Sequence, residues 1–494
     1  MIDTDFTLTS PLAAPGGIRH LLLALTIVWH PEAARIGEQA LQAVPEEAVQ
    51  LNRYCPLFGH PDGQPLSLGL AGISRETLRF ARDCDGNVVL TLPACRMVVE
   101  LNGSVVSGSV SFSRAQIEGG QILTLGRTCV LCVHWIDRLP RNNHLPELAG
   151  VGSAAVALRD QLRMVAPSDM TVLLRGETGT GKEIAARAIH ALSRRSGAPL
   201  VTVNMAAMNE ALAGAELFGA VRGAYTGMGA ERKGLFAEAA QGTLFLDEIG
   251  NTAPAVQPML LRVLEGGDYR PLGAARDARS SARLIAASDQ ALDASAFNHA
   301  LLRRLEAFVI ELPPLRERRE DIGVLMLHLL EHLDPVAPLS APLLAEMAAY
   351  DWPGNIRQLA HALKRAQLLV QSGSMPQFEQ LVRLSAVRPV PAMEDAGAPR
   401  HKGSMPNDAD IVDAMEQHAW EIKAAAGALG ISRPTLYKML DCHAQIRRPE
   451  QIKTAEVTQA LDRSNGDLAR CASLLQTPAE WLRRHLRTLG HTAI

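Results

Sequence analysis

The segment that decides the fold is the glycine-rich stretch Gly176-Glu177-Thr178-Gly179-Thr180-Gly181-Lys182-Glu183, which lies between the β-rich run Thr171–Leu174 and the helical run Ile184–Leu192. Glycines allow backbone N–H groups to turn toward phosphates at a helix N-terminus, and Lys182 adds a positive charge for the β- and γ-phosphates. Strand, loop, lysine and helix follow in the required order, which favours a phosphate-binding loop over a glycine-rich turn that ends in lysine. Glu183 stands where Ser or Thr usually supplies a magnesium ligand, so a metal needs another carboxylate.

A second apolar strand, Thr243–Leu246, ends in the acids Asp247 and Glu248. Taken alone, two acids after a strand usually mark nothing more than a strand edge. The spacing from the phosphate loop favours a catalytic pair instead. Asp247 would hold Mg²⁺, directly or through water, and Glu248 would polarise the attacking water in phosphoryl transfer.

Length and charge limit the class of protein. The chain has 494 residues, 47% apolar and 20% charged, and 49 Lys+Arg against 52 Asp+Glu give a formal net charge of −3. At roughly 100–200 residues per domain we expect about three domains. Near-neutral charge excludes a polybasic tail protein and confines any nucleic-acid surface to part of the chain. The longest apolar run, Leu21–Trp29, is shorter than the ~20 residues that cross a bilayer, and seven scattered cysteines fit a reducing compartment. We therefore expect a soluble cytoplasmic protein with no membrane partner.

Three shifts in composition divide the chain. Residues 1–137 hold short β-rich runs separated by Gly and Asn, which predicts an all-β module. From Pro146 onward, β-rich runs alternate with longer helical patterns, which predicts an α/β fold with a parallel sheet covered by helices. After Leu384 a stretch rich in Pro, Ala and Gly is typical of a flexible linker, and residues 411–490 have helical patterns.

Residues 146–384 resemble the AAA+ domain of bacterial enhancer-binding proteins, the ATPases that activate sigma-54 RNA polymerase. The segments that carry the resemblance follow the family's order: Gly176–Glu183, Val203-Asn204, Glu216–Gly219, Gly223–Met228, Gly242–Gly250, Leu312–Arg318 and Trp352–Arg357. The resemblance implies a P-loop ATPase core over residues 146–312 and a helical lid over 313–385. It also implies ATP and Mg²⁺ as cofactors.

The same resemblance implies roles for single residues. Asn204 matches the switch residue that hydrogen-bonds the catalytic glutamate, and Arg357 matches the lid arginine that contacts the nucleotide of its own subunit. The loop that family members press onto sigma-54 matches Gly223, Ala224, Tyr225, Thr226, Gly227 and Met228, in which Tyr225 replaces the commoner Phe and Met228 replaces Ala.

The family's arginine fingers match the segment from Phe297 to Leu305. The first arginine is replaced by Asn298, whereas the second is retained as Arg304, with Arg303 beside it as an alternative. In the family these arginines reach the nucleotide of a neighbouring subunit, so the resemblance implies a hexameric-type ring. A further departure is Ser288-Asp289 in place of Thr-Asn. Asp289 would bring a negative charge near the γ-phosphate, where like charges repel, so we expect slower hydrolysis.

After the linker of residues 386–410, residues 411–442 resemble the Fis-type helix-turn-helix that ends many enhancer-binding proteins. Small residues at Ala424–Ala426 allow close helix packing, Gly430 supplies a turn, and Ser432 can cap the second helix. The resemblance implies that Arg433, Thr435, Tyr437 and Lys438 face double-stranded DNA. A plain helical hairpin that binds another protein is the alternative.

A shift of 46 residues, from Ile411 to Val457, brings a second apolar pattern into register over residues 455–490. Ala414, Leu436 and Leu440 then fall on Ala460, Leu482 and Leu486. We interpret this as a second, degenerate helix-turn-helix, with coincidental helical periodicity as the alternative. Arg483, Arg484 and Arg487 would then form a basic edge suited to phosphate contacts.

Residues 17–137 resemble a forkhead-associated domain, a β-sandwich whose loops bind phosphothreonine. The resemblance rests on Arg35–Glu38, Gly72–Arg75, Leu101–Gly103 and Leu125–Arg127. Ser74, Arg75 and Asn102 are the positions that would clamp a phosphothreonine protein, because a hydroxyl, a guanidinium and an amide suit that task. A docking sandwich that needs no phosphate is an equal alternative. Cys129 and Cys132 form a CxxC without a partner pair, so a metal site is not expected.

Together these patterns predict a transcription activator that binds upstream DNA and uses ATP to remodel sigma-54 RNA polymerase holoenzyme, under the control of its N-terminal module. The alternative is a DNA-bound repressor or scaffold that binds ATP and hydrolyses it weakly, because of the departures at Asn298, Asp289 and Met228.

Overall fold

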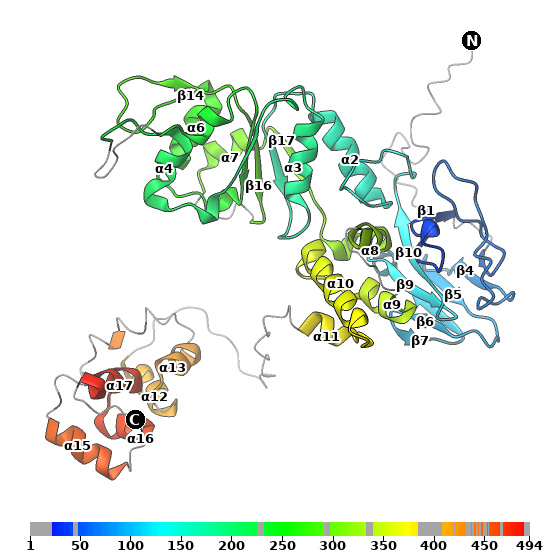
Figure 1. Ribbon diagram of the computed structural model, residues 1–494. Coiled ribbons are helices and arrows are strands. Elements are labelled where there is room, and N and C mark those ends of the chain that lie inside the picture. The colour runs from blue at the N-terminus through cyan, green and yellow to red at the C-terminus, as the bar shows by residue number, and fades with distance from the viewer. Residues whose placement is uncertain are drawn as a thin grey trace. The chain divides into compact units, whose positions relative to one another are not determined.

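The computed structural model describes residues 22–42, 48–224, 232–290, 292, 297–331, 339–383, 408–418, 420–429, 454–464 and 468–488, with single positions between 436 and 452 (Figure 1). It forms two compact units, Met1–Pro389 and Val390–Ile494. In the described part of the chain, no helix is both long enough and apolar enough to cross a membrane.

The N-terminal β-module, residues 22–136, consists of two antiparallel sheets. Its strands are β1 (Leu22–Trp29), β2 (Gln39–Gln42), β3 (Val49–Leu51), β4 (Leu78–Arg82), β5 (Val88–Thr91), β6 (Val99–Leu101), β7 (Ser104–Val105), β8 (Ser109–Phe112), β9 (Gln121–Leu125) and β10 (Cys129–Ile136), with one short helix, α1 (Arg114–Glu118). The strand orders are β2-β1-β10-β9-β6-β7 and β3-β4-β5-β8. One apolar core includes residues of both sheets, among them Leu25, Phe80 and Leu131, so the sheets pack face to face.

The central domain has a five-stranded sheet in the order β12-β13-β16-β11-β17, and every pairing in it is parallel. The strands are β11 (Val172–Arg175), β12 (Leu200–Asn204), β13 (Thr243–Asp247), β16 (Arg283–Ser288) and β17 (Phe308–Glu311). A small hairpin, β14 (Asp268–Tyr269) and β15 (Ala278–Arg279), lies outside it. Because parallel strands share one carboxyl edge, Asp247 and Ser288 end beside the loop that follows β11.

Helices cover both faces of this sheet, because the strands carry apolar side chains on both faces and each face must be buried. On one face α2 (Ser153–Val165) and α3 (Lys182–Ala191) pack on Leu174, Phe245 and Ile285. On the other face the apolar core contains Leu173 and Leu246 together with residues of α4 (Glu210–Phe218), α5 (Leu235–Glu238), α6 (Gln257–Gly266) and α7 (His299–Leu305).

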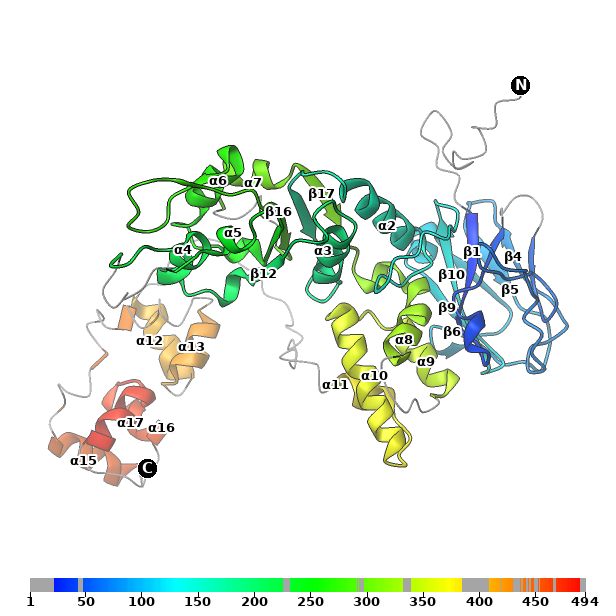
Figure 2. The same ribbon diagram turned by 45° about the horizontal axis from the view of Figure 1, so that its top comes forward.

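The lid follows β17. It comprises the 3₁₀ turns η6 (Leu315–Glu317) and η7 (Arg319–Asp321) and the helices α8 (Ile322–Glu331), α9 (Ala341–Ala349), α10 (Asn355–Gln371) and α11 (Phe378–Arg383). Trp352 is fully buried in the lid core and donates its indole N–H to the carbonyl of Met347 over 2.7 Å. Figures 1 and 2 both show α8 and α9 lying against the sheet of the β-module that contains β9 and β10.

The C-terminal unit is helical in its described part: α12 (Asp408–Gln417), α13 (Ile422–Ala428), α15 (Thr454–Arg463), α16 (Leu468–Leu475) and α17 (Ala479–Thr488). The start of α15 lies 46 residues after the start of α12, and α16 starts 46 residues after α13. One apolar core contains Ile411, Met415 and Leu436 together with Val457, Leu461 and Leu482. The two halves of the tail therefore share one apolar core.

Candidate active site

The phosphate loop, residues 176–182, joins β11 to α3 at the carboxyl edge of the central sheet. Gly179 and Gly181 have φ angles of +83° and +104°, a backbone region that favours glycine. A Cβ atom at Gly179 would lie 2.4 Å from the carbonyl oxygen of Gly354, because the lid approaches the loop here. Thr180 Oγ1 donates to the carbonyl of Glu177 over 2.8 Å, which closes the turn from within.

The loop, the acids of β13 and the first turn of α10 line one pocket of about 230 Å³. Its walls include Gly179, Gly181, Lys182, Glu183, Asp247, Glu248, Ile356 and Arg357. The structure therefore brings together the loop, the acid pair and the lid arginine that were predicted from widely separated segments. Glu183 is also paired with Arg187 one turn along α3.

Lys182 and the acid pair define the charge of this pocket. Lys182 Nζ donates to the carbonyls of Gly176 and Glu177 over 2.7 and 3.1 Å, and burial lowers the pKa of Lys182 while Asp289, Asp247 and Glu248 oppose that shift. Burial raises the pKa of Asp247, whose Oδ1 accepts the backbone N–H of Glu248 over 3.0 Å. A half-buried carboxylate of this kind gains stability when a cation binds.

Glu248 has a left-handed backbone, with φ +55°, which is uncommon outside glycine and often marks functional positions. Its Oε2 accepts a hydrogen bond from Asn251 Nδ2 over 3.4 Å. The carboxylate thus lies beyond the strand end, beside the pocket, where it can orient a water molecule.

Two lid residues that sequence reasoning missed hold the phosphate loop. Arg316 donates from both terminal nitrogens to Glu177 over 2.9 and 2.7 Å, and Asn355 Nδ2 donates to Glu177 Oε2 and to the Thr178 carbonyl, each over 3.1 Å. Hydrogen bonding from Arg316, and then from Asn355, lowers the pKa of Glu177. Both residues belong to the segments that carried the resemblance, but only Arg357 had received a role.

Comparisons with known proteins agree with this geometry. Residues 148–311 match the family described as the sigma-54 interaction domain, 316–387 match the AAA+ ATPase lid domain, and 411–441 match the bacterial regulatory protein, Fis family. The transcriptional regulatory protein ZraR of Salmonella typhimurium is 40% identical over 302 residues, which cover 59% of this chain and 68% of ZraR. The chain belongs to the sigma-54-dependent transcriptional regulators.

One further relative and one solved structure are also similar to this chain. The anaerobic nitric oxide reductase transcription regulator NorR of Enterobacter sp. is 42% identical over 238 residues, which cover 46% of this chain and 47% of NorR. The solved structure of NtrX from Brucella abortus in complex with ADP aligns at 25% identity over 71% of this chain and 70% of that chain, with a TM-score of 0.44. The predicted AAA+ ATPase domain with its lid and the C-terminal Fis-type segment are confirmed.

In this sigma-54-dependent regulator Asn204, the predicted switch residue, contacts the backbone of the following turn. Asn204 ends β12 beside Asp247, and its Oδ1 accepts the backbone N–H groups of Ala206 and Ala207 over 2.8 and 3.3 Å. Among the hydrogen bonds of the described residues, the side chain of Glu248 pairs with Asn251 and not with Asn204. The side chain of Asn204 caps the following 3₁₀ turn, which is the common use of an asparagine at a helix start.

Two residues at which this regulator departs from the family pattern, Asp289 and Asn298, both make hydrogen bonds within the core. Asp289 Oδ2 accepts the hydroxyl of Thr178 over 2.8 Å, so its charge lies against the phosphate loop as expected. Asn298 caps α7, since its Oδ1 accepts the N–H groups of Ala300 and Leu301 over 2.9 and 3.1 Å. Arg304 is exposed, with its nearest carboxylate, Glu265, at 3.6 Å.

Several predicted residues lie outside the described residues. In the sigma-54 loop these are Tyr225, Thr226, Gly227 and Met228, whereas Gly223 and Ala224 are described just before them. In the first helix-turn-helix they are Arg433, Thr435, Tyr437 and Lys438. Arg483 is exposed on α17.

In the β-module of the regulator, Ser74 and Arg75 lie in the long loop between β3 and β4, and Arg75 is exposed. Asn102 occupies the turn between β6 and β7 with φ +48°, where its Oδ1 accepts the N–H of Ile122 and its Nδ2 donates to Gln121 Oε1, each over 2.9 Å. Its amide is thus committed to the turn. Among the described residues no group of three or more His, Cys, Asp or Glu is placed to hold a metal ion.

Proposed function

We propose that this chain is a transcription activator that hydrolyses ATP to remodel sigma-54 RNA polymerase holoenzyme and so open the promoter. The observation that carries the proposal is the pocket in which Lys182, Asp247 and Glu248 of the sigma-54 interaction domain meet Arg357 of the lid domain. Lys182 and the loop N–H groups bind the β- and γ-phosphates, and Glu248 orients the water that attacks the γ-phosphate.

The acid pair also fits a magnesium ion. Mg²⁺ prefers carboxylate and water oxygens, and Asp247 offers a half-buried carboxylate beside Lys182. When bound there, the ion would neutralise part of the charge that develops on the phosphates. Arg357 lies on the lid side of the same pocket, so it contacts the nucleotide that its own subunit holds.

Two further elements complete the proposed activator. The loop 223–228, through Thr226 and Tyr225, contacts sigma-54. The Fis-type segment, through Arg433, Thr435, Tyr437 and Lys438, binds upstream DNA, and the basic edge of α17 adds phosphate contacts. Arg304 of one subunit reaches the nucleotide of its neighbour in a hexameric-type ring, a role that its exposure allows.

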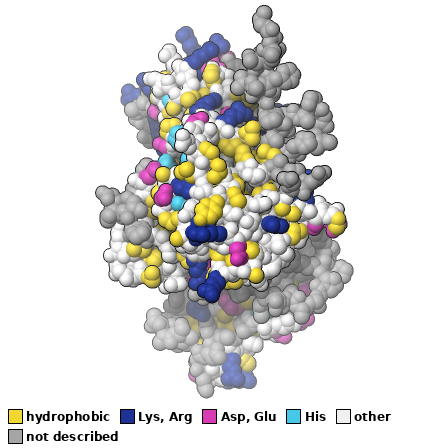
Figure 3. Space-filling view, turned by 90° about the vertical axis from the view of Figure 1, so that its right-hand side faces the viewer, with side chains coloured by type: hydrophobic (Ala, Val, Ile, Leu, Met, Phe, Trp, Pro, Cys, Tyr) yellow, Lys and Arg dark blue, Asp and Glu magenta, His cyan; other side chains and the backbone are white. Residues whose placement is uncertain are grey.

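The β-module is proposed to receive the regulatory signal from a phosphothreonine protein in the manner of a forkhead-associated domain. The sandwich of two antiparallel sheets supports this, as does the exposed loop with Ser74 and Arg75. Met97 of a neighbouring loop accepts the N–H of Ser74 at its sulfur over 3.3 Å, which brings the exposed Arg96 near the same end of the module. Figure 3 shows separate Lys and Arg groups among hydrophobic patches on this side of the molecule. Phosphate-independent docking of a partner protein is the alternative.

A second function has specific observations in its favour. Asn298 serves as a helix cap in place of an arginine finger, and Asp289 places a negative charge against the phosphate loop. Both favour weak hydrolysis, as in a DNA-bound repressor or scaffold that uses ATP mainly for assembly.

One assay separates the two functions. Full-length protein, sigma-54 holoenzyme and a promoter with the upstream site are combined, and open complexes are counted with and without ATP. The activator requires ATP and loses open complexes in Thr226→Ala and Glu248→Gln, whereas the exposed control Thr91→Ala behaves as the wild type. DNA binding without ATP-dependent open complexes would support the repressor or scaffold instead.

A further inference from the structure

The β-module is joined to the lid by a continuous apolar core. Val28, Ile122, Val130 and Cys132, on the outer face of β1, β9 and β10, are at most 1% exposed and belong to one cluster with the lid residues. Helix α8 contacts β1, and α9 contacts β1, β9 and β10. Burial of this kind stabilises an interface in proportion to the apolar area removed from water.

Glycines bring the two surfaces into backbone contact. A Cβ atom at Gly323, in the first turn of α8, would lie 2.2 Å from the carbonyl oxygen of Val28. At Gly120 of the module, a Cβ atom would lie 3.2 Å from Arg319 Cβ and from Cys132 Sγ. A Cβ atom does not fit at Gly323 and would be tightly packed at Gly120, so the module and the lid meet at van der Waals distance.

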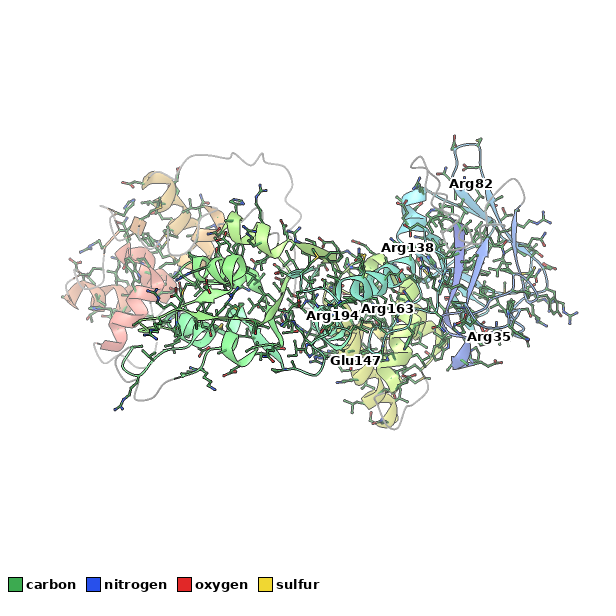
Figure 4. All side chains as sticks on the ribbon, turned by 90° about the horizontal axis from the view of Figure 1, so that it is seen from above. Arg35, Arg82, Arg138, Glu147, Arg163 and Arg194 are labelled. Atoms are coloured by element: carbon green, nitrogen blue, oxygen red, sulfur yellow. The ribbon has the colours of Figure 1, made fainter. Side chains whose placement is uncertain are left out.

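The segment that connects the module to the ATPase core contacts both of them. Asn142 Nδ2, in the connection to the core, donates to Asp62 of the module over 2.6 Å. The hydroxyl oxygen of Ser153, at the start of α2, accepts the N–H groups of Asp137 and Arg138, each over 3.2 Å. Figure 4 shows Arg138 in this connection, between the module that carries Arg35 and the core helix that carries Arg163.

Gly37 lies where module, lid and core meet. A Cβ atom on this glycine would lie 2.7 Å from Val324 Cγ2 of the lid and 3.2 Å from Val151 Cγ1 of the core. Beside it, Asp321 of the lid accepts the N–H groups of Val151 and Gly152 of the core over 2.6 and 2.7 Å. The module therefore touches both sides of the joint between lid and core.

We propose that the β-module is a brace that restrains the movement of the lid over bound nucleotide, and that a partner which draws the module away releases the lid. The inference rests on the proposed ATPase function. Arg357 of the lid lines the nucleotide pocket, and Asn355 and Arg316 of the lid hydrogen-bond the phosphate loop, so the lid must shift when nucleotide enters or leaves. Since the rigid sandwich contacts Val324 on the lid and Val151 on the core, that shift requires the module to break one contact or the other.

Two alanine substitutions test the brace from opposite sides. Gly323→Ala forces a methyl group against Val28 while favouring the helix itself, because alanine is a better helix former than glycine. Gly37→Ala, at φ +90°, forces a methyl group against Val324 and Val151 from the module side. The control is Gly427→Ala in α13, where a Cβ atom would meet nothing within 4 Å.

The readouts are the release rate of a fluorescent ADP analogue from the full chain and hydrogen exchange. We expect both variants to release the analogue at least about threefold faster than the wild type and the control, as gating by a lid predicts. Amides of β1 and α8 should exchange faster, with β4 and β5 unchanged.

Three outcomes would overturn the brace. Unchanged amide hydrogen exchange in β1 and α8 of both variants would show that the β-module and the lid are not tightly packed. Faster exchange with an unchanged release rate would show that the module does not restrain the lid. If the wild type binds no analogue at all, the proposed ATPase function fails together with the brace, and this result is distinct from the other two.

Discussion

Arg316 of the lid and Glu177 of the phosphate loop form two hydrogen bonds, of 2.9 and 2.7 Å. They are 139 residues apart in the sequence. The pair ties the lid to the loop that binds phosphate, so the position of the lid and the shape of the loop are linked.

Removal of this pair should weaken nucleotide binding. Both side chains are partly exposed, so the pair contributes only modestly to the free energy of ATP binding. We therefore expect Arg316→Ala to raise the Kd for ATP by about 3- to 10-fold. Fluorescence titration with a non-hydrolysable ATP analogue measures it. The exposed pair of Arg114 and Glu118 on α1 provides the control, and Arg114→Ala should leave the Kd unchanged. An unchanged Kd in Arg316→Ala would mean that the pair does not link lid and loop.

Asp289 should make ATP binding less favourable, since its carboxylate accepts the hydroxyl of Thr178 at the phosphate loop. Asp289→Asn keeps an acceptor for Thr178 but removes the negative charge that repels the γ-phosphate. We expect the KM for ATP to fall by about 2- to 5-fold, in line with a partly screened charge. Steady-state phosphate release at varied ATP concentration tests this, with Asp268→Asn on the exposed hairpin as the control. A KM that rises or stays constant argues against electrostatic repulsion at this position.

The cap at Asn298 makes a prediction about stability. Asn298→Ala removes the acceptor for two N–H groups of α7 and should cost about 1 kcal/mol of unfolding free energy, whereas Asn298→Asp, which can still cap, should cost little. Urea unfolding followed by circular dichroism distinguishes them. Equal losses in the two variants would show that the side chain contributes through something other than its capping oxygen.

The burial of Glu320 predicts that the stability of the protein depends on pH. Burial, and then the neighbouring Asp321, raise the pKa of Glu320 to about 8 from an ordinary value of 4.5. Between these pH values the folded chain binds a proton that the unfolded chain has released, so this residue's contribution to stability is full below pH 4.5 and is lost as pH rises through about 8.

Glu320→Gln removes this titration. We expect the melting temperature of the wild type to fall more between pH 5.5 and 8.5 than that of the variant, by a difference that corresponds to at least about 1 kcal/mol. Scanning calorimetry at the two pH values measures it, with the exposed Glu118→Gln as the control. Parallel pH dependence in variant and wild type would contradict a protonated Glu320 in the folded state.

Sequence patterns were most informative where function depends on a short continuous segment. The phosphate loop and the acids after β13 were found because strand, loop and helix follow directly in the chain. The strand order β12-β13-β16-β11, which the structure supplies, then places Asp247 at the same edge of the sheet as the loop.

The same patterns were less informative for polar side chains with more than one use. Asn204 was assigned through the family's switch position, and its side chain caps the turn that follows it, as the side chain of Asn298 caps α7. Asn102 holds its own turn. The side-chain amide of an asparagine can contact a ligand or hydrogen-bond a nearby backbone N–H group equally well. Which contact it makes depends on the surrounding structure.

By itself, then, the sequence determined the P-loop ATPase core, its acid pair and the Fis-type tail, because local backbone geometry and short spacings encode them. The tertiary structure alone decided that Arg316 and Asn355 hold the phosphate loop and that the β-module packs on the lid. Those contacts join residues more than a hundred positions apart in the sequence. The close approach of Gly323 to Val28 and the pairing of Arg316 with Glu177 depend on how the domains pack against each other. A local sequence pattern therefore does not predict these contacts.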